Sequence, residues 1–294
     1  MKLNRRKVLC LALLAAALFG SVRFASASAS WPNEPSGASL ISDYNYNAVS
    51  GDGWFSTGGD SSIISDATAP LSPNSVLQMR YATGFKAGIA PDNSYHSLNG
   101  AQREVYAGFW WKASPNWQQE VNSAVSKIAF FVSNGAFDVF IGMQGPQGGP
   151  YALSAVFESP TLSNGHLPAS YGDNPGTRVL LGNVSRPSVV PGNWYRIEMY
   201  SKHSSTSTSR DGIFRWWVNG ALCGDYTNVN FTDLPWVQFN LSPTWGGMNN
   251  TKTQTDYYWF DHIRLSLPKG GAASPTDQPP GPPAAPRILN VVVQ

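Results

Sequence analysis

Cysteine is nearly absent from this sequence, which contains only Cys10 and Cys223 in 294 residues. Cys10 lies in an N-terminal apolar run and lacks the small residue expected just before a lipoprotein cysteine. If that run is removed, Cys223 remains alone and no intramolecular disulfide can form. Cys223 follows a predicted hairpin turn, so we expect it to fill the core as a small apolar residue.

Charge is scarce as well, because only 13% of the residues are Asp, Glu, Lys or Arg. The chain has 20 basic and 18 acidic residues, but five of the basic ones lie in residues 1–29. Without that segment, 15 basic residues face 18 acidic ones, a net charge of −3. A mildly acidic chain without Lys/Arg runs is not expected to bind nucleic acid. Any polyanionic ligand would have to be met by a few local cations.

Motifs for metal, phosphate and paired-carboxylate chemistry are also missing. No His, Cys and Glu residues have zinc-site spacing, and no phosphate-binding loop is present, so we expect no required cofactor or metal. A structural Ca²⁺ held by Asp and backbone oxygens remains compatible with the sequence. Glu104, Glu158 and Glu198 are the strand-borne glutamates, and their spacing disfavours retaining glycoside hydrolysis.

The first 29 residues are typical of a signal peptide. A basic start is followed by an apolar run over residues 8–20, and Ala-Ser-Ala sequences at 25–27 and 27–29 offer cleavage sites. The run is too short to span a bilayer, and no later run is longer. We therefore expect a protein that is secreted or periplasmic, monomeric and not inserted in a membrane.

Residues 30–268 are uniform in composition, with short alternating runs punctuated by Gly, Ser, Asn and Pro. This pattern predicts a single all-β domain, whereas the Gly/Pro-rich residues 269–286 predict a linker and residues 287–294 a short tail. Asn219-Gly220 predicts a tight hairpin, because both residues tolerate positive φ. The clearest strands are predicted at residues 76–80, 104–112, 126–132, 137–143, 151–157, 194–201, 213–218, 221–226 and 257–267.

The sequence contains eleven tryptophans, all after the N-terminal segment. The indole ring stacks on the C–H face of a sugar and is equally suited to filling a sandwich core. We expect about two thirds of these tryptophans to pack in the core. The others are candidates for sugar contacts.

Strand alternation predicts which side chains face outwards. On residues 103–112, Glu104, Tyr106, Trp110 and Lys112 share one face, with Arg103 on the other. On residues 126–131 we expect Ile128 and Phe130 in the core and Lys127 on the opposite face with Ala129 and Phe131. On the last strand, Tyr258, Phe260, His262 and Arg264 alternate with Tyr257, Trp259, Asp261 and Ile263.

The segments EVYAGFWWKASPNW, SKIAFF and DGIFRWWVNG, followed by Trp-Gly-Gly at 245–247 and YYWFDHIRLS, resemble the concanavalin A-like jelly-roll polysaccharide lyases of the alginate and glucuronan type. The resemblance covers most of residues 70–267. It implies an all-β, two-sheet jelly-roll sandwich that acts on a uronate-containing polysaccharide by β-elimination. Such a reaction requires a base and a group that neutralises the uronate carboxylate.

The resemblance also implies which residues would form the site. Lys127 matches a family lysine, and His262 and Tyr106 are further catalytic candidates. The family's Ser-x-Arg and Tyr-x-Tyr positions are not matched. Because Asp261 and His262 are adjacent, their side chains point to opposite faces, which favours a structural role for His262. We expect one groove on the concave sheet lined by Tyr106, Trp110, Lys112, Lys127, Gln144 and His262, with Arg103, Tyr151 and Trp245 as further substrate contacts.

Two hypotheses remain open, an enzyme and a non-catalytic carbohydrate-binding, lectin-like module. The two hypotheses predict different cations in the groove. An enzyme acting on uronates should bring Arg103 or Lys127 together with a Tyr or His in one groove, whereas a lectin needs only aromatic side chains with Asn, Gln and Asp.

Overall fold

The computed structural model describes residues 31–121, 125–133, 138–158, 179–231, 235–247 and 249–269. These residues form sixteen β-strands and no helix. The predicted signal peptide, most of the linker and the tail lie outside the described residues. No helix in the described ranges has the length and apolarity needed to cross a membrane.

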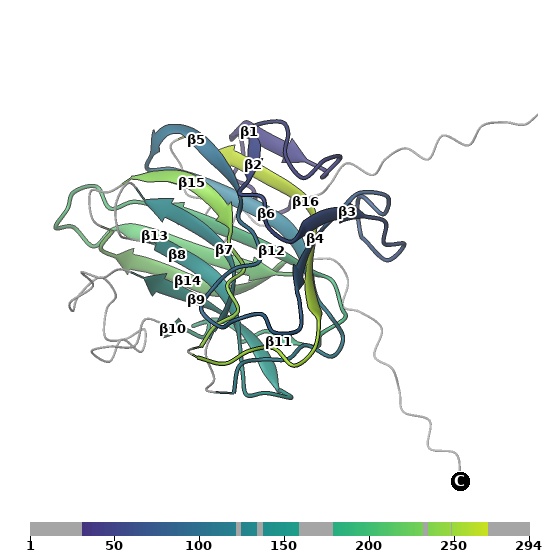
Figure 1. Ribbon diagram of the computed structural model, residues 1–294. Helices are drawn as coiled ribbons and strands as arrows, with labels where there is room; N and C mark the ends of the chain where they lie inside the picture. The colour runs from purple at the N-terminus through teal and green to yellow at the C-terminus, as the bar shows by residue number, and fades with distance from the viewer. Residues whose placement is uncertain are drawn as a thin grey trace, which may run out of the picture. The chain divides into compact units, whose positions relative to one another are not determined.

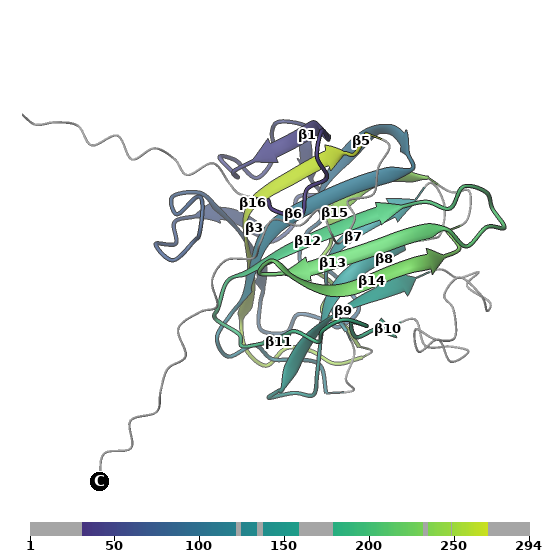
Figure 2. The same ribbon diagram turned by 180° about the vertical axis from the view of Figure 1, so that it is seen from behind.

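Two antiparallel sheets of eight strands each lie face to face. In sheet A the strand order is β14-β13-β12-β6-β16-β4-β3, and β1 also pairs with β16. In sheet B the order is β10-β9-β8-β7-β15-β5-β2, and β11 also pairs with β9. Strands β7, β8 and β9 lie in front in Figure 1, and β12, β13 and β14 come to the front when the molecule is turned (Figure 2). The predicted all-β, two-sheet sandwich is confirmed.

The strands of sheet A are β1 (Ser39–Tyr44), β3 (Ser61–Ile64), β4 (Val76–Tyr81), β6 (Glu104–Ala113), β12 (Tyr195–Lys202), β13 (Gly212–Val218), β14 (Ala221–Val229) and β16 (Asp256–Leu267). The strands of sheet B are β2 (Trp54–Ser56), β5 (Ser94–Gln102), β7 (Ser126–Ser133), β8 (Asp138–Gln144), β9 (Tyr151–Glu158), β10 (Val179–Leu180), β11 (Ser188–Val189) and β15 (Trp236–Leu241). Each of the nine strands expected from the sequence is present, with small shifts at the ends.

The turn between β13 and β14 has the predicted conformation. Asn219 and Gly220 have φ angles of 52° and 85°, and Val218 pairs with Ala221 across the turn. These are the positive values that a type I′ turn requires and that Asn and Gly adopt most readily. The predicted hairpin is therefore confirmed.

Aromatic side chains fill the space between the sheets. Eight of the eleven tryptophans are buried, namely Trp31, Trp54, Trp111, Trp117, Trp216, Trp217, Trp236 and Trp245. Trp110, Trp194 and Trp259 are partly exposed. Cys223 is also in the core, and burial raises the pKa of its thiol. Six of the eight buried tryptophans, all but Trp31 and Trp217, belong to the core cluster between the sheets, somewhat fewer than the two thirds expected.

Two bulges change which side chains face outwards. In β7 the pairing with β8 shifts between Lys127 and Ala129. Lys127 consequently lies on the same face as Phe130, whereas Ile128, Ala129 and Phe131 are in the core. The predicted core position of Phe130 and outer positions of Ala129 and Phe131 are wrong, because a bulge adds one residue and reverses the alternation after it.

The second bulge lies in β16 at His262, where the pairing with β6 shifts between Asp261 and Ile263. His262 has a φ of 53°, a left-handed conformation. Tyr258 and Phe260 before the bulge and Ile263 after it all face the core. The predicted strict alternation along β16 is therefore wrong at this point.

Candidate functional site

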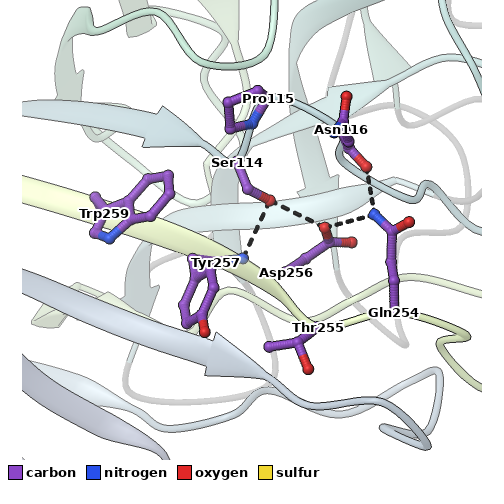
Figure 3. Close-up of a pocket in the computed structure, with 8 residues that line it drawn as sticks. All are labelled: Ser114, Pro115, Asn116, Gln254, Thr255, Asp256, Tyr257 and Trp259. Carbon is purple, nitrogen blue, oxygen red and sulfur yellow. Dashed lines mark hydrogen bonds between the residues drawn. The ribbon is translucent and has the colours of Figure 1, made fainter.

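An open pocket of about 430 Å³ lies where β6 ends and β16 begins (Figure 3). Strand β6 leads into the turn at Ser114, and the Ser114 amide donates to the Tyr257 carbonyl. The pocket is lined by Ser114, Pro115, Asn116, Gln254, Thr255, Asp256, Tyr257 and Trp259. We call it the β16 pocket.

An aromatic surface bounds one side of the β16 pocket. The rings of Tyr257 and Trp259 are stacked, with centroids 5.5 Å apart and planes inclined by 19°. Both residues are partly exposed because they alternate with the core residues Tyr258 and Phe260. The Trp259 indole is fixed by a 3.1 Å hydrogen bond that it donates to Gln78. The pair is therefore a rigid apolar surface at the rim of a polar pocket.

Behind Trp259, the Lys112 ammonium lies 4.8 Å from the Trp259 ring and 4.6 Å from the Trp194 ring. The same ammonium donates to Asp66 and Thr68. Burial alone would raise the pKa of Asp66, but the hydrogen bonds from Lys112 and Thr68 lower it below its usual value. Lys112 therefore supports the aromatic surface and is itself 7% exposed.

The polar floor of the β16 pocket is centred on Asp256, which is 1% exposed. Its Oδ1 accepts hydrogen bonds from the Ser114 hydroxyl at 3.0 Å and the Gln254 amide at 2.8 Å. Its Oδ2 accepts from the Gln118 backbone amide at 2.9 Å and the Lys252 ammonium at 2.7 Å. The dashed lines in Figure 3 show the Ser114 and Gln254 contacts. The carboxylate is thus fully occupied by the protein itself.

Three polar groups of the lining have no hydrogen-bond partner among the described residues. They are the side-chain amide of Asn116, the side-chain carbonyl of Gln254 and the hydroxyl of Tyr257. Asn116 is exposed, and Gln254 and Tyr257 are partly exposed. These groups can donate to and accept from a ligand that lies on the aromatic surface.

A smaller pocket of about 260 Å³ lies beyond Gln118. It is lined by Gln118, Gln119, Glu120, Val121, Gln147, Trp245, Asn250, Thr251 and Thr253. Trp245 is 1% exposed and donates from its indole to the Gln118 carbonyl, so its ring offers little surface to a ligand. Trp245 is the one predicted substrate-binding residue that lines either of these two pockets.

Tyr106, predicted as a catalytic residue, is completely buried in sheet A. Its hydroxyl donates to Glu198 at 2.7 Å, and burial, followed by the charge of Glu198, raises its pKa well above the usual value. The Trp31 ring covers the neighbouring Gly108, where an added Cβ would lie 2.5 Å from the indole. The expected solvated face is therefore closed at Tyr106.

His262 is held on the outer face of sheet A by acidic neighbours. Its Nε2 lies 2.5 Å from Asp43 Oδ1, and Arg264 donates to the other oxygen of Asp43 at 3.0 Å. The adjacent Asp261 is buried, which raises the pKa of its carboxyl, and it accepts from the Leu71 amide. Trp110, also in sheet A, is partly exposed, with the Arg196 guanidinium 5.9 Å from its ring.

The remaining predicted residues lie elsewhere. Lys127 is on the outer face of sheet B, with its ammonium 5.6 Å from the Phe130 ring and 5.0 Å from the Phe140 ring. Gln144 is at the end of β8 in the same sheet. Tyr151 is in the core and donates to the Trp117 carbonyl. Arg103 lies between β5 and β6 and donates to the Ser204 carbonyl.

These positions show that the predicted single groove is wrong. Tyr106, Trp110, Lys112 and His262 belong to sheet A, whereas Lys127 and Gln144 belong to sheet B. The outer faces of two stacked sheets point in opposite directions, so these two sets cannot line one groove. The catalytic and binding roles of the individual residues stay predictions.

The residues of the β16 pocket were not predicted as a site. Tyr257 and Trp259 were placed correctly on one face of the last strand, but Asn116, Gln254 and Asp256 were not singled out. Two features of the sequence could have indicated this pocket. A polar turn, Ser-Pro-Asn, follows one aromatic strand, and a polar run, Gln-Thr-Asp, precedes another. Within the described residues, no three His, Cys, Asp or Glu side chains are grouped as metal ligands would be.

Neither a family model nor a curated protein matches this sequence. Solved structures do match. A double mutant of the alginate lyase Aly36B bound to an alginate trisaccharide is 15% identical, with a TM-score of 0.55, and the match covers 77% of this chain and 98% of that chain. The alginate lyase vAL-1 from Chlorella virus is 12% identical, with a TM-score of 0.53 and coverages of 78% and 100%. This chain shares their jelly-roll fold.

Proposed function

We propose that this protein binds polysaccharide and that the β16 pocket holds one of its sugar rings. The observation that carries this proposal is the stacked pair of Tyr257 and Trp259 beside the unpartnered polar groups of Asn116 and Gln254. An aromatic face stacks on the C–H groups of a sugar, while amides and hydroxyls bind its hydroxyl groups. The pocket offers both on adjacent surfaces.

The rigidity of the site also supports binding. Trp259 is fixed by Gln78 and Lys112, and the Asp256 network holds Ser114 and Gln254 in place. A preformed site loses little side-chain entropy when it takes up its ligand. The alginate trisaccharide complex of Aly36B is a further support, because a protein of similar fold binds a glycan.

Affinity gel electrophoresis tests this proposal. We expect wild-type protein to be retarded in gels that contain at least one polysaccharide of a panel of alginate, glucuronan, pectate, mannan and glucans. The variant Trp259→Ala should be retarded clearly less than wild type. A wild-type protein retarded by none of these polymers, or a Trp259→Ala variant retarded as strongly as wild type, would contradict the proposal.

A second candidate function is that of a polysaccharide lyase acting on a uronate-containing glycan. It is favoured by the fold shared with two alginate lyases and by Lys127, a cation on the outer face of sheet B. In such a reaction a base removes the proton α to the uronate carboxyl, the C–O bond at the next carbon breaks, and the departing oxygen receives a proton. The product is an unsaturated uronate.

Lys127 is the base that this second function would use. Tyr106 is completely buried against Glu198, whereas Lys127 and His262 are both partly exposed and His262 is bound to Asp43. Absorbance of unsaturated uronates, recorded on alginate, glucuronan and pectate, is the direct assay. We expect turnover to disappear in Lys127→Ala while its circular dichroism spectrum remains that of wild type. Absence of turnover by wild type on all three polymers would remove this candidate.

We also propose that the protein is exported, with its mature N-terminus at Ser28 or Ser30. This rests on the basic start, the apolar run and the Ala-Ser-Ala sequences of residues 1–29. N-terminal sequencing of protein recovered from the medium or periplasm is the test. An intact Met1 start on that protein would contradict it.

A further inference from the structure

We infer that the β16 pocket selects uncharged sugars and rejects uronates. This inference rests on the proposed function, since it names the class of glycan that the same pocket takes. It follows from the charges of the lining residues and from the partners that those charges already have.

Only one residue of the lining carries a charge. Asp256 is 1% exposed and accepts four hydrogen bonds from the protein, one of them from the Lys252 ammonium. The other lining side chains are hydroxyl, amide, aromatic and proline groups, which bear no charge at neutral pH. The ligand therefore meets neutral donors and acceptors.

Among the described residues, three cations adjoin the lining residues directly, and each is bound to a carboxylate. The exposed Lys86 pairs through its backbone with Thr251, which is outside the lining. Lys252 is 2.7 Å from Asp256 and has no exposed side-chain surface. Lys112 is paired with Asp66 behind Trp259.

The third cation, Arg80, lies opposite Tyr257 in the register of β4 and β16 and is 2.6 Å from Asp60. Its side chain is 50% exposed, so it is the one cation of the three that solvent reaches freely. It does not line the pocket, and its charge is shared with Asp60.

A uronate ring in this pocket would lose part of the hydration of its carboxylate and would meet no unpaired cation among the lining residues. Taking a charged group out of water is unfavourable unless it is paired. The buried Asp256 carboxylate and the Lys252 ammonium offset each other's charge, so this pair offers no free cation either. A neutral ring of the same shape avoids the cost of the unpaired carboxylate and keeps the stacking and the amide contacts.

Polyuronates and their carboxyl-reduced forms provide a matched test, because reduction converts each carboxylate into a hydroxymethyl group on the same backbone. Calorimetry would compare native and carboxyl-reduced alginate, glucuronan and pectate, together with neutral mannan and glucan. We expect at least one neutral polymer to bind, at least about tenfold more tightly than any native polyuronate. Its affinity should change little between low and high salt, since no ion pair forms.

Variants assign the binding to this pocket. Tyr257→Ala should abolish it, and Tyr257→Phe, which keeps the ring and removes the hydroxyl, should weaken it. Phe55→Ala is the matched control, because Phe55 stacks on Tyr95 at 5.6 Å on sheet B and is 53% exposed. That variant should bind as wild type does.

Two results would overturn the inference in distinguishable ways. A native polyuronate that binds as tightly as its reduced form, with binding lost in Tyr257→Ala, would refute the selection for neutral sugars and leave the proposed function intact. Loss of that binding in Arg80→Gln would identify Arg80 as the counter-charge. If no polymer binds in a manner that depends on Tyr257, the proposed function itself fails.

Discussion

The Lys252 ammonium lies 2.7 Å from the Asp256 carboxylate, and both side chains are almost completely removed from solvent. The same ammonium lies 3.9 Å from the centre of the Trp117 ring and 4.7 Å from that of Trp245, and it donates to the Gln118 carbonyl. Through its contacts with Trp117 and Gln118, the Lys252 ammonium ties the segment before β16 to the segment after β6. The β16 pocket lies between these segments, so its geometry depends on the pair.

Replacing Lys252 by methionine should destabilise the protein strongly. The substitution removes the hydrogen bonds that Lys252 donates to the buried Asp256 carboxylate and to the Gln118 carbonyl, which a deprotonated lysine would keep. Removing one partner of a buried pair in this way typically costs about 3–5 kcal/mol. Urea denaturation would measure the free energy of unfolding. Arg80→Gln breaks the exposed pair with Asp60 and should cost only about 0–1 kcal/mol. Equal losses for the two variants would show that burial does not set the cost.

Stability should rise between pH 8 and 10. Burial lowers the pKa of Lys252 from 10.5 to about 8, even though Asp256 opposes this shift. Between these two values the unfolded chain binds a proton that the folded protein has released, so the free energy of unfolding increases with pH, by about 1–2 kcal/mol up to pH 10. Below pH 8 both states are protonated and the burial penalty remains in full.

Above pH 10 this trend should reverse. Burial raises the pKa of Tyr81 and Tyr258 well above the usual value, so the unfolded chain loses these protons first and stability falls.

Urea titrations at pH 7, 8, 9 and 10 would follow the rise in stability that is expected from Lys252. The rise should be absent from Lys252→Met. If the free energy of unfolding of this variant increases with pH as steeply as that of wild type, Lys252 is not the cause of the rise.

Trp259→Ala should weaken glycan binding by about 1–3 kcal/mol, taking the stacking of bases on aromatic side chains as an analogue. Calorimetry with the polymer that wild type binds most tightly would give the value. Phe55→Ala serves again as control and should lose less than about 0.5 kcal/mol. A loss of equal size in both variants would indicate an effect that is not specific to the β16 pocket.

Gly108→Ala should destabilise the outer face of sheet A. The added Cβ would lie 2.5 Å from the Trp31 ring, so Trp31 must move, at a cost of about 1–3 kcal/mol. The double variant Gly108→Ala with Trp31→Ala should lose less stability than the sum of the two single variants, because the clash with Trp31 is then removed and only the 3.0 Å contact with the Tyr106 hydroxyl remains. Additive losses in this cycle would exclude the Trp31 contact as the cause.

Much of the fold could be predicted because its signals are local. The positive φ values of Asn219 and Gly220 follow from those two residues alone, and strand alternation placed Tyr257 and Trp259 correctly on one face of the last strand. It did not indicate that this face is the outer one. Strand β15 was missed although it is central in sheet B, because it is short and carries polar residues at Gln238 and Asn240. Short strands with amides resemble loops in sequence.

The candidate site was largely beyond such prediction. Asp256 and Lys252 look like residues of a polar loop, and nothing local indicates that they are buried against Trp117. Closure of the Tyr106 face depends on Trp31, which is distant in sequence. Burial of a polar residue is decided by whatever packs over it.

The sequence by itself determined nine of the sixteen described β-strands and the hairpin at Asn219 and Gly220, because each depends on backbone preference or on the alternation of neighbouring side chains. Only the tertiary structure decided that β6 and β16 lie in sheet A while β7 and β8 lie in sheet B, and that bulges at Ile128 and His262 reverse the alternation. Sheet membership is set by contacts between distant segments, and one inserted residue moves every later side chain to the other face.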